Sequence, residues 1–136
     1  MFSFLNKEQE IMAPVTGKTL DIKDVPDEVF SSKMVGDGIA IDPSGDTFVA
    51  PADGILKMLF ATNHAYALEL KKGVEILVHI GLDTVGLNGE GFTALKKQGD
   101  IVKKGEAIIK IDPEFIKSKG ISLISPVIFT EPSSLK

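Results

Sequence analysis

The chain has 136 residues, 43% of them hydrophobic and 25% charged, so it is long enough for one well-packed domain and too short for two. Its 15 basic side chains, all lysines, are outnumbered by 19 acidic ones, and the net charge of -4 argues against a partner such as nucleic acid. Cysteine is absent, which excludes disulfides, thiolate nucleophiles and cysteine-ligated zinc.

The N-terminal residues 1–10 have neither a basic leader nor an apolar core, and we expect a flexible tail there. Further along, no apolar run approaches the roughly 18 residues that a membrane span requires. We therefore expect no stable membrane insertion and a cytoplasmic location. Residues 1–136 are interpreted as a single domain.

Short aliphatic runs separated by turn residues follow along the chain. Each run has four to seven residues, and the turns between them are rich in glycine, proline and aspartate. This pattern predicts an all-β protein, an antiparallel β-sandwich or barrel with a few short helices. The expected strands lie at 38–41, 47–50, 54–60, 64–70, 74–80, 106–111 and 125–129. Short helices or turns are expected at 27–32 and at 113–119, the second with Asp112 as its N-cap.

A weak internal repeat accompanies these strands. The segment APVTG at 13–17 matches APADG at 50–54, and SPVIF at 125–129 is a degenerate third copy. In the first two copies a glycine permits a sharp turn into a strand. The repeat indicates a sheet built from related halves, although chance similarity among Pro-Gly turns explains it equally well.

The two histidines, His64 and His79, flank one predicted β-hairpin that turns at 71–73. A turn at Lys71-Lys72 pairs the two histidines directly, whereas a turn at Lys72-Gly73 or a four-residue loop places His79 opposite Tyr66. Each option puts both rings on one face, roughly 5–8 Å apart at Cβ, and only a three-residue loop would separate them. The same face would carry Tyr66, Leu68, Leu70 and Leu77.

Two kinds of chemistry suit such a pair. Neutral imidazole is a zinc ligand, so His64 and His79 are possible adventitious zinc ligands, with Asp83 as a third, although no usual zinc spacing occurs. Imidazole is also a nucleophile that needs no general base near neutral pH, because its ordinary pKa is about 6.5. A second histidine or the hydroxyl of Thr62 could then stabilise charge on a phosphoryl group.

Three motifs resemble the glucose-type enzyme IIA of the bacterial phosphoenolpyruvate–sugar phosphotransferase system. They are TNHAYAL at 62–68, VHIGLDTVGLNGEGF at 78–92 and DVPDEVFSSKMVGDGIAIDP at 24–43, and the APADG turn also fits. The resemblance runs from about residue 11 to residue 129. It implies a sandwich of the duplicated hybrid motif type and no cofactor.

The resemblance also implies roles for individual residues. His79 would be the phosphorylated nucleophile, His64 an auxiliary histidine that stabilises the transition state, and Thr62 the hydroxyl that orients the pair. The phosphoryl group would come from the histidine phosphocarrier HPr and pass to a cysteine of the sugar-specific EIIB domain. The residues implied in partner contacts are Asp27, Phe30, Met34, Val35, Phe60, Leu77, Gly81, Asp83 and Val85.

Other interpretations remain open. The family usually continues through another strand pair after the SPVIF segment, and we expect that pair to be missing here. The APxxG turns and GDIVKKGE also fit a biotinyl- or lipoyl-like carrier, for which Lys71 or Lys72 is the candidate attachment site, although the usual flanking residues are absent. A third reading is a non-catalytic scaffold that binds regulators.

Overall fold

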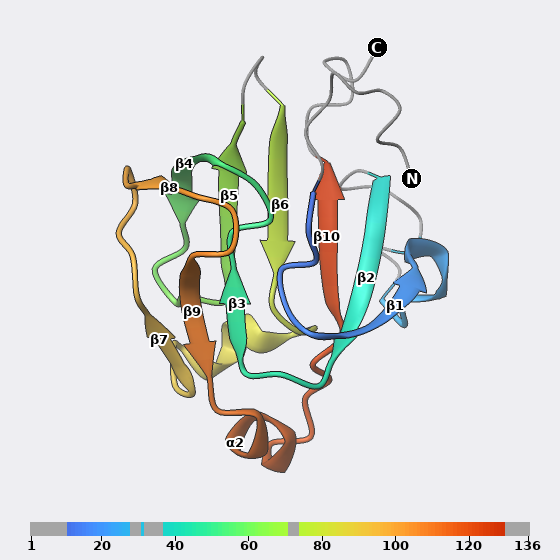
Figure 1. Cartoon of the computed structure of the whole chain (residues 1–136). Coiled ribbons are helices and arrows are strands. Elements are labelled where there is room, and N and C mark those ends of the chain that lie inside the picture. Colours follow the sequence, from blue (N-terminus) through green and yellow to red (C-terminus); the bar gives the residue numbers. More distant parts are fainter. Residues whose placement is uncertain (1–10, 28–30, 32–36, 71–73, 130–136) are drawn as a thin grey trace.

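The computed structural model describes residues 11–27, 31, 37–70 and 74–129 (Figure 1). Its strands are β1 (Gly17–Asp21), β2 (Asp37–Pro43), β3 (Thr47–Val49), β4 (Gly54–Leu59), β5 (Ala65–Glu69), β6 (Glu75–His79), β7 (Phe92–Ala94), β8 (Ile101–Val102), β9 (Ala107–Ile111) and β10 (Ser125–Phe129). Helical turns are few: the 3-10 helices η2 (Ile22–Asp24) and η4 (Thr84–Leu87), and the α-helix α2 (Pro113–Ser118).

The strands form two antiparallel sheets that pack face to face. The larger sheet has seven strands in the order β1-β2-β10-β6-β5-β4-β8, and the smaller has three in the order β3-β9-β7. In Figure 1 the small sheet lies in front of the β4–β5 part of the large one. The main core fills the space between them, with Phe48 and Ile109 from the small sheet against Tyr66, Leu68 and Val78 from the large one. The predicted all-β antiparallel sandwich is confirmed.

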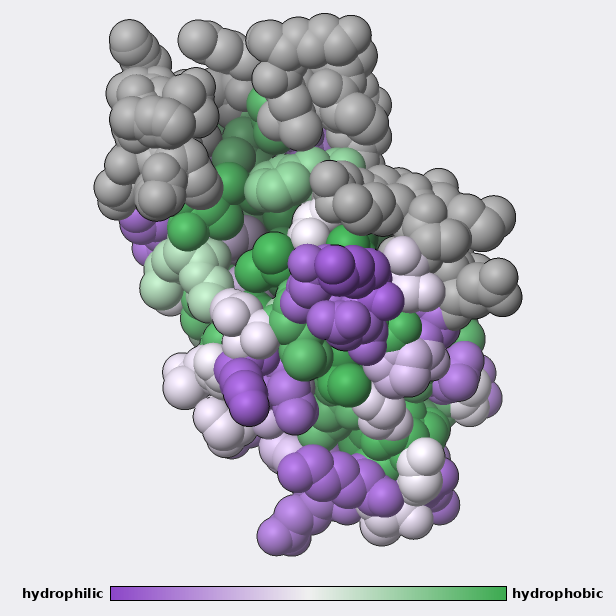
Figure 2. Space-filling model, turned by 90° about the vertical axis from the view of Figure 1, so that its right-hand side faces the viewer, coloured by the Kyte–Doolittle hydropathy of each residue, from purple (hydrophilic) through white to green (hydrophobic). Residues whose placement is uncertain are grey.

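The large sheet also has a partly covered outer face, where a second apolar cluster lies. Along β6, Ile76 and Val78 enter the main core, whereas Leu77 points the other way. A buried cluster on that outer side is made by Ile22, Val25, Ala40, Leu82 and Ile128. Figure 2 shows the side of the molecule that carries β1 and β2, where hydrophobic surface lies in patches between hydrophilic side chains.

The predicted strands match seven of those found, and three further strands were not predicted. Strands β1, β7 and β8 are short or largely exposed, so they lack the apolar run that marks a buried strand. Helix α2 is confirmed, with the Asp112 carboxylate accepting a hydrogen bond from the Phe115 N–H at 3.2 Å. The predicted element at 27–32 lies mostly outside the described residues, as do the tail 1–10 and the hairpin turn 71–73 with Lys71 and Lys72. In the part of the chain that is described, no helix is both long and apolar enough to cross a membrane.

The two APxxG segments lie side by side. The Met12 N–H donates to the Pro51 carbonyl at 2.9 Å, and the Val49 N–H donates to the Pro14 carbonyl at 2.7 Å. Each segment leads into a strand whose first residue is the glycine, Gly17 in β1 and Gly54 in β4. A Cβ at either glycine would lie 2.4 Å or 2.6 Å from a carbonyl oxygen of the neighbouring strand. Close approach of two strands, not a sharp turn, therefore requires these glycines.

Candidate functional site

The strand register places the two histidines differently from the prediction. Strands β5 and β6 pair Ala65 with His79 and Tyr66 with Val78. The Leu70 N–H donates to the Val74 carbonyl at 2.7 Å, so three residues lie between the last paired positions. This corresponds to the three-residue loop, which by strand alternation alone would place the two histidines on opposite faces of the sheet. The prediction that Tyr66, Leu68 and Leu70 share their face is wrong, because these side chains lie in the main core and only Leu77 points to the side of His79.

The histidine rings nevertheless meet, because His64 lies outside the regular strand. It precedes β5 in a turn closed by hydrogen bonds from the Phe60 N–H to the Ala65 carbonyl at 3.1 Å and from the Asn63 N–H to the Phe60 carbonyl at 2.7 Å. Asn63 has a left-handed backbone with φ of 59°. This conformation breaks the strand's alternation and turns the His64 ring toward His79, with ring centroids 5.0 Å apart and planes 76° apart.

A backbone hydrogen bond fixes the tautomer of His79. Its Nδ1 lies 2.8 Å from the carbonyl oxygen of Gly81. A carbonyl only accepts, so Nδ1 carries the proton and donates it. In the neutral ring the other nitrogen, Nε2, then has a free lone pair. His79 is half-buried, so the residue as a whole is partly open to solvent.

His64 is held by a side chain and an aromatic ring. Its Nδ1 is hydrogen-bonded to Oγ1 of Thr62, and its ring packs edge-on against Phe60 at a centroid distance of 5.3 Å. When the Thr62 hydroxyl donates to Nδ1, the proton of neutral His64 sits on Nε2. That nitrogen is then a hydrogen-bond donor beside His79.

Both imidazoles are biased toward their neutral forms. Burial lowers the pKa of His79, although the hydrogen bond to Gly81 and the carboxylates of Asp27 and Asp83 raise it in part. Burial also lowers the pKa of His64, and the neighbouring charge of His79 lowers it further. Both rings are therefore mostly uncharged at neutral pH, which leaves the lone pair of His79 available for attack.

The remaining predicted contact residues fall into two groups. Phe60 and Val85 are 38% and 54% exposed, Leu77 is half-buried, and Asp27 and Asp83 lie close enough for their charges to act on His79. Phe60 places apolar surface against His64, and the two carboxylates bring negative charge close to His79. Phe30, Met34 and Val35 lie outside the described residues. Within the described residues no three His, Asp or Glu side chains cluster as metal ligands would, so Asp83 does not complete a metal site with the two histidines.

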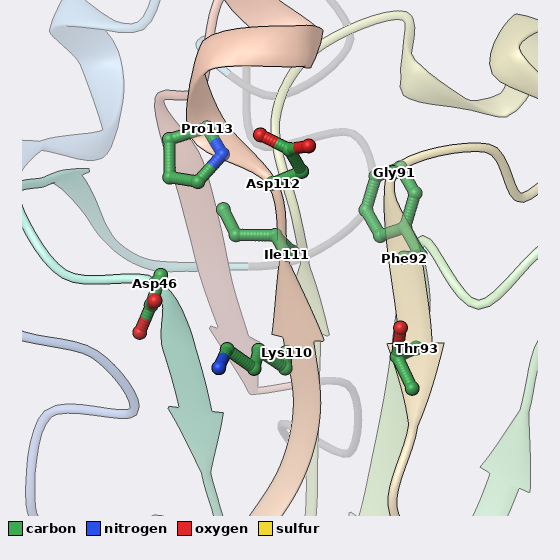
Figure 3. Close-up of a pocket in the computed structure, with 8 residues that line it drawn as sticks. All are labelled: Asp46, Gly91, Phe92, Thr93, Lys110, Ile111, Asp112 and Pro113. Carbon is green, nitrogen blue, oxygen red and sulfur yellow. The ribbon is translucent and has the colours of Figure 1, made fainter.

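A hollow lies on the small sheet, beside β7 and β9 (Figure 3). It has a volume of about 450 Å³ and is lined by Asp46, Gly91, Phe92, Thr93, Lys110, Ile111, Asp112 and Pro113. Its two carboxylates have local structural tasks. Asp46 accepts a hydrogen bond from the Thr47 hydroxyl at 2.9 Å, and Asp112 caps α2. The hollow contains no histidine, so the histidine pair is the stronger candidate site.

Sequence reasoning missed three residues that shape the site. Asn63 supplies the left-handed turn before His64, while Thr84 and Ser125 supply buried hydroxyls beside the loop that follows His79. An Asn directly before a histidine is a signal for a left-handed turn, because Asn tolerates positive φ better than most residues. Nothing in the sequence pattern separates Ser125 from the chain's other serines.

Comparison with known proteins finds a matching family and several relatives of this chain. A model of the family "phosphoenolpyruvate-dependent sugar phosphotransferase system, EIIA 1" matches residues 9–135. The chain is 47% identical over 123 residues to the glucose-specific EIIA component of Haemophilus influenzae, covering 90% of this chain and 74% of that protein. It is 49% identical over 124 residues to the glucoside-specific EIICBA component of Staphylococcus carnosus, covering 91% of this chain and 18% of that protein.

A solved structure is similar as well. The glucose permease IIA of Mycoplasma capricolum superposes with a TM-score of 0.86 at 43% identity, covering 90% of this chain and 79% of that one. The family match spans all the described residues, including both histidines and the loops that hold them. The chain therefore belongs to the EIIA 1 family of the phosphoenolpyruvate-dependent sugar phosphotransferase system.

Proposed function

We propose that this chain is a phosphocarrier that accepts a phosphoryl group from phospho-HPr on Nε2 of His79 and passes it to a cysteine of an EIIB domain. The observation that carries this proposal is the hydrogen bond between Nδ1 of His79 and the Gly81 carbonyl. It leaves Nε2 as the nucleophilic nitrogen of a ring that burial keeps neutral.

In the accepting step, the Nε2 lone pair of His79 forms a bond to phosphorus while the N–P bond of the donor histidine breaks. The donor ring leaves with the bonding electron pair. The imidazole of His79 becomes more positive as the new bond forms, and the Gly81 carbonyl stabilises this charge through the Nδ1–H bond. The onward step reverses these roles, since a thiolate attacks phosphorus and Nε2 recovers its lone pair. No bound cofactor takes part in either step.

His64 assists by its position. Its ring lies 5.0 Å from that of His79, with Thr62 on its Nδ1, so its Nε2–H is placed to donate to a phosphoryl oxygen on His79. In the transition state of such a transfer the negative charge is spread over the three phosphoryl oxygens, and a fixed hydrogen-bond donor to one of them lowers the barrier.

The surroundings of the histidines fit protein partners. The acidic residues Asp27 and Asp83 attract a basic partner, and the exposed Phe60 and Val85 offer apolar contact. The chain has no arginine and no cysteine, so a guanidinium and the acceptor thiol would both come from partners. The names of the relatives specify glucose or a glucoside, and one names a glucose permease, so we propose such a permease as the destination and the cytoplasm as the place of reaction.

The direct test is incubation with phosphoenolpyruvate, enzyme I and HPr, followed by mass spectrometry of the intact chain and its peptides. One acid-labile phosphate on the peptide that contains His79, absent in His79→Ala, is the expected result. Labelling of His79→Ala to the level of the parent would reject the proposal. Biotin or lipoate on a lysine of the chain isolated from cells would instead support a carrier module, and failure to incorporate any phosphate would leave a binding scaffold.

A further inference from the structure

We infer that two buried hydroxyls, those of Thr84 and Ser125, are positioning residues that hold the tautomer of His79 through the Ile80–Gly81 backbone. The expected effect on phosphate transfer rests on the proposed function, whereas the hydrogen bonds of the Gly81 loop do not. Both hydroxyls bond backbone groups of the loop whose carbonyl the imidazole binds. Both residues are completely buried, so each hydroxyl is shielded from water.

The two hydroxyls bond the two polar groups of one peptide unit, the Ile80 carbonyl and the Gly81 N–H. The Thr84 hydroxyl donates to the Ile80 carbonyl at 2.6 Å, and the Gly81 N–H donates to the Ser125 hydroxyl at 3.0 Å. The Ser125 hydroxyl in turn donates to the Leu123 carbonyl at 2.8 Å, so its proton is committed and its lone pair faces Gly81. The carbonyl and N–H of a trans peptide point in opposite directions, so this plane is fixed on both edges.

The next peptide unit carries the carbonyl that His79 binds. Its Leu82 N–H donates to the Ser122 carbonyl at 3.0 Å, while its Gly81 carbonyl accepts from Nδ1 of His79 at 2.8 Å. The opposed directions of the two groups mean that the bond to Ser122 aims the carbonyl at the imidazole. The segment that enters β10 therefore sets the protonated nitrogen of a histidine on β6.

Gly81 leaves this arrangement little freedom. Its φ is 76°, and a Cβ there would lie 2.6 Å from Cγ2 of Thr84 and 2.8 Å from the Ser122 carbonyl oxygen. The loop is thus packed tightly on the two elements that supply its hydrogen bonds. Loss of either hydroxyl leaves a buried backbone group without its partner, and the loop must shift to satisfy that group. A shifted Gly81 carbonyl no longer selects the Nδ1–H form of His79.

The test measures the tautomer of His79 by the ¹⁵N chemical shifts of its ring, in the unphosphorylated chain above the imidazole pKa. Thr84→Val keeps the side-chain volume and removes the hydroxyl, whereas Thr84→Ser keeps the hydroxyl. Ser125→Ala removes the second hydroxyl. Ser122→Ala is the matched control, because that side chain bonds the Ile124 N–H and not the Gly81 loop.

We expect the parent, Thr84→Ser and Ser122→Ala to show His79 almost wholly as the Nδ1–H tautomer. Thr84→Val and Ser125→Ala should each show a mixture, with the rate of phosphate acceptance reduced about tenfold, a cost of about 1.4 kcal/mol. An unchanged tautomer in folded Thr84→Val overturns the inference even if Ser125→Ala fails to fold. Equal effects of Thr84→Val and Thr84→Ser also overturn it.

The same experiment distinguishes failure of the positioning inference from failure of the proposed function. If the tautomer shifts as expected but no variant, nor the parent, accepts phosphate, the positioning role stands and the phosphocarrier proposal fails. If the parent accepts phosphate on His79 and the tautomer never shifts, the phosphocarrier proposal stands and this inference fails.

Discussion

The two histidines are held by loops of different construction. The loop after His79 is tied to Ser122, Thr84 and Ser125 by three hydrogen bonds and contains a glycine that no other residue could replace without a clash. The turn before His64 is closed by local backbone hydrogen bonds around the left-handed Asn63, with the part-buried Thr62 hydroxyl on the ring, and the Ile80 N–H donates to the His64 carbonyl at 2.7 Å. The ring of His79 is therefore oriented through contacts between distant segments, whereas Thr62 and Phe60, which contact the ring of His64, belong to its own turn. Substitutions in the two loops should therefore have different effects on stability and on phosphate transfer.

The largest effect should follow from Gly81→Ala. The added Cβ meets Thr84 and the Ser122 carbonyl in a left-handed backbone, and we expect a loss of about 2–4 kcal/mol in the free energy of unfolding. Urea denaturation measures this loss. Gly99→Ala is the control, since φ is also positive there, at 98°, but a Cβ would have nothing within 4 Å. Equal losses in the two variants would contradict the tight packing described for the Gly81 loop.

Next in size is the effect of His64→Ala on phosphate transfer. The variant keeps the nucleophile and should accept phosphate from HPr, but it loses a donor to the phosphoryl oxygens in onward transfer. We expect onward transfer to an EIIB domain to fall about 100-fold, as for loss of a single charge-stabilising donor. Single-turnover transfer of labelled phosphate gives both rates. Onward transfer at the parental rate would remove His64 from the mechanism.

A smaller, more local effect is expected at Asn63. Asn63→Gly should preserve the turn, while Asn63→Ala should cost about 1–2 kcal/mol because a residue with a Cβ is disfavoured at positive φ. Asn88→Ala is the matched control, since Asn88 has φ of 53° but follows η4. Both alanine variants should lose similar stability, as measured by urea denaturation. Only Asn63→Ala should slow onward phosphate transfer. Slower transfer in both variants would show that the effect does not depend on the turn before His64.

Much of this architecture could be predicted from sequence, and the failures have physical causes. The β-sandwich follows from short apolar runs, and helix α2 from Asp112 before Pro113. The proximity of His64 and His79 was predicted from strand alternation, but the register makes that reasoning wrong. The rings meet because Asn63 takes His64 out of the strand, which a period-two pattern cannot represent. The roles inferred for Thr84 and Ser125 depend on contacts between distant segments, and no local pattern encodes these.

The smallest effects concern pH. The unfolded chain has histidines with ordinary pKa values near 6.5, while burial lowers both values in the folded chain. Between the folded and unfolded pKa values the unfolded chain binds more protons than the folded chain, so the free energy of unfolding rises with pH there. The contribution of the two histidines is fully present above about pH 6.5 and is lost as pH falls from there through the lowered values. Urea denaturation between pH 5 and 8 should show this trend, and His79→Ala with His64→Ala should flatten it. A trend that survives both substitutions would place its origin elsewhere.

Asp83 provides a test of how nearby charge affects the pKa of His79. Its carboxylate raises the pKa of His79, so Asp83→Asn should lower the midpoint of the His79 titration further, while asparagine tolerates the left-handed φ of 61°. Titration of the ring by NMR measures the shift. Asp46→Asn, in the hollow of the small sheet, removes one charge away from His79 and should leave the midpoint unchanged. A midpoint above 6.5 in the parent would contradict the dominance of burial.

The hydrogen bond to the Gly81 carbonyl should leave Nε2 of His79 as the nitrogen that bonds phosphorus. The most direct measurement is the ¹⁵N–³¹P coupling in the chain labelled with ¹⁵N-histidine and phosphorylated through HPr. We expect one-bond coupling to Nε2 of His79, with Nδ1 still protonated. Coupling to Nδ1 of His79, or to either nitrogen of His64, would contradict it.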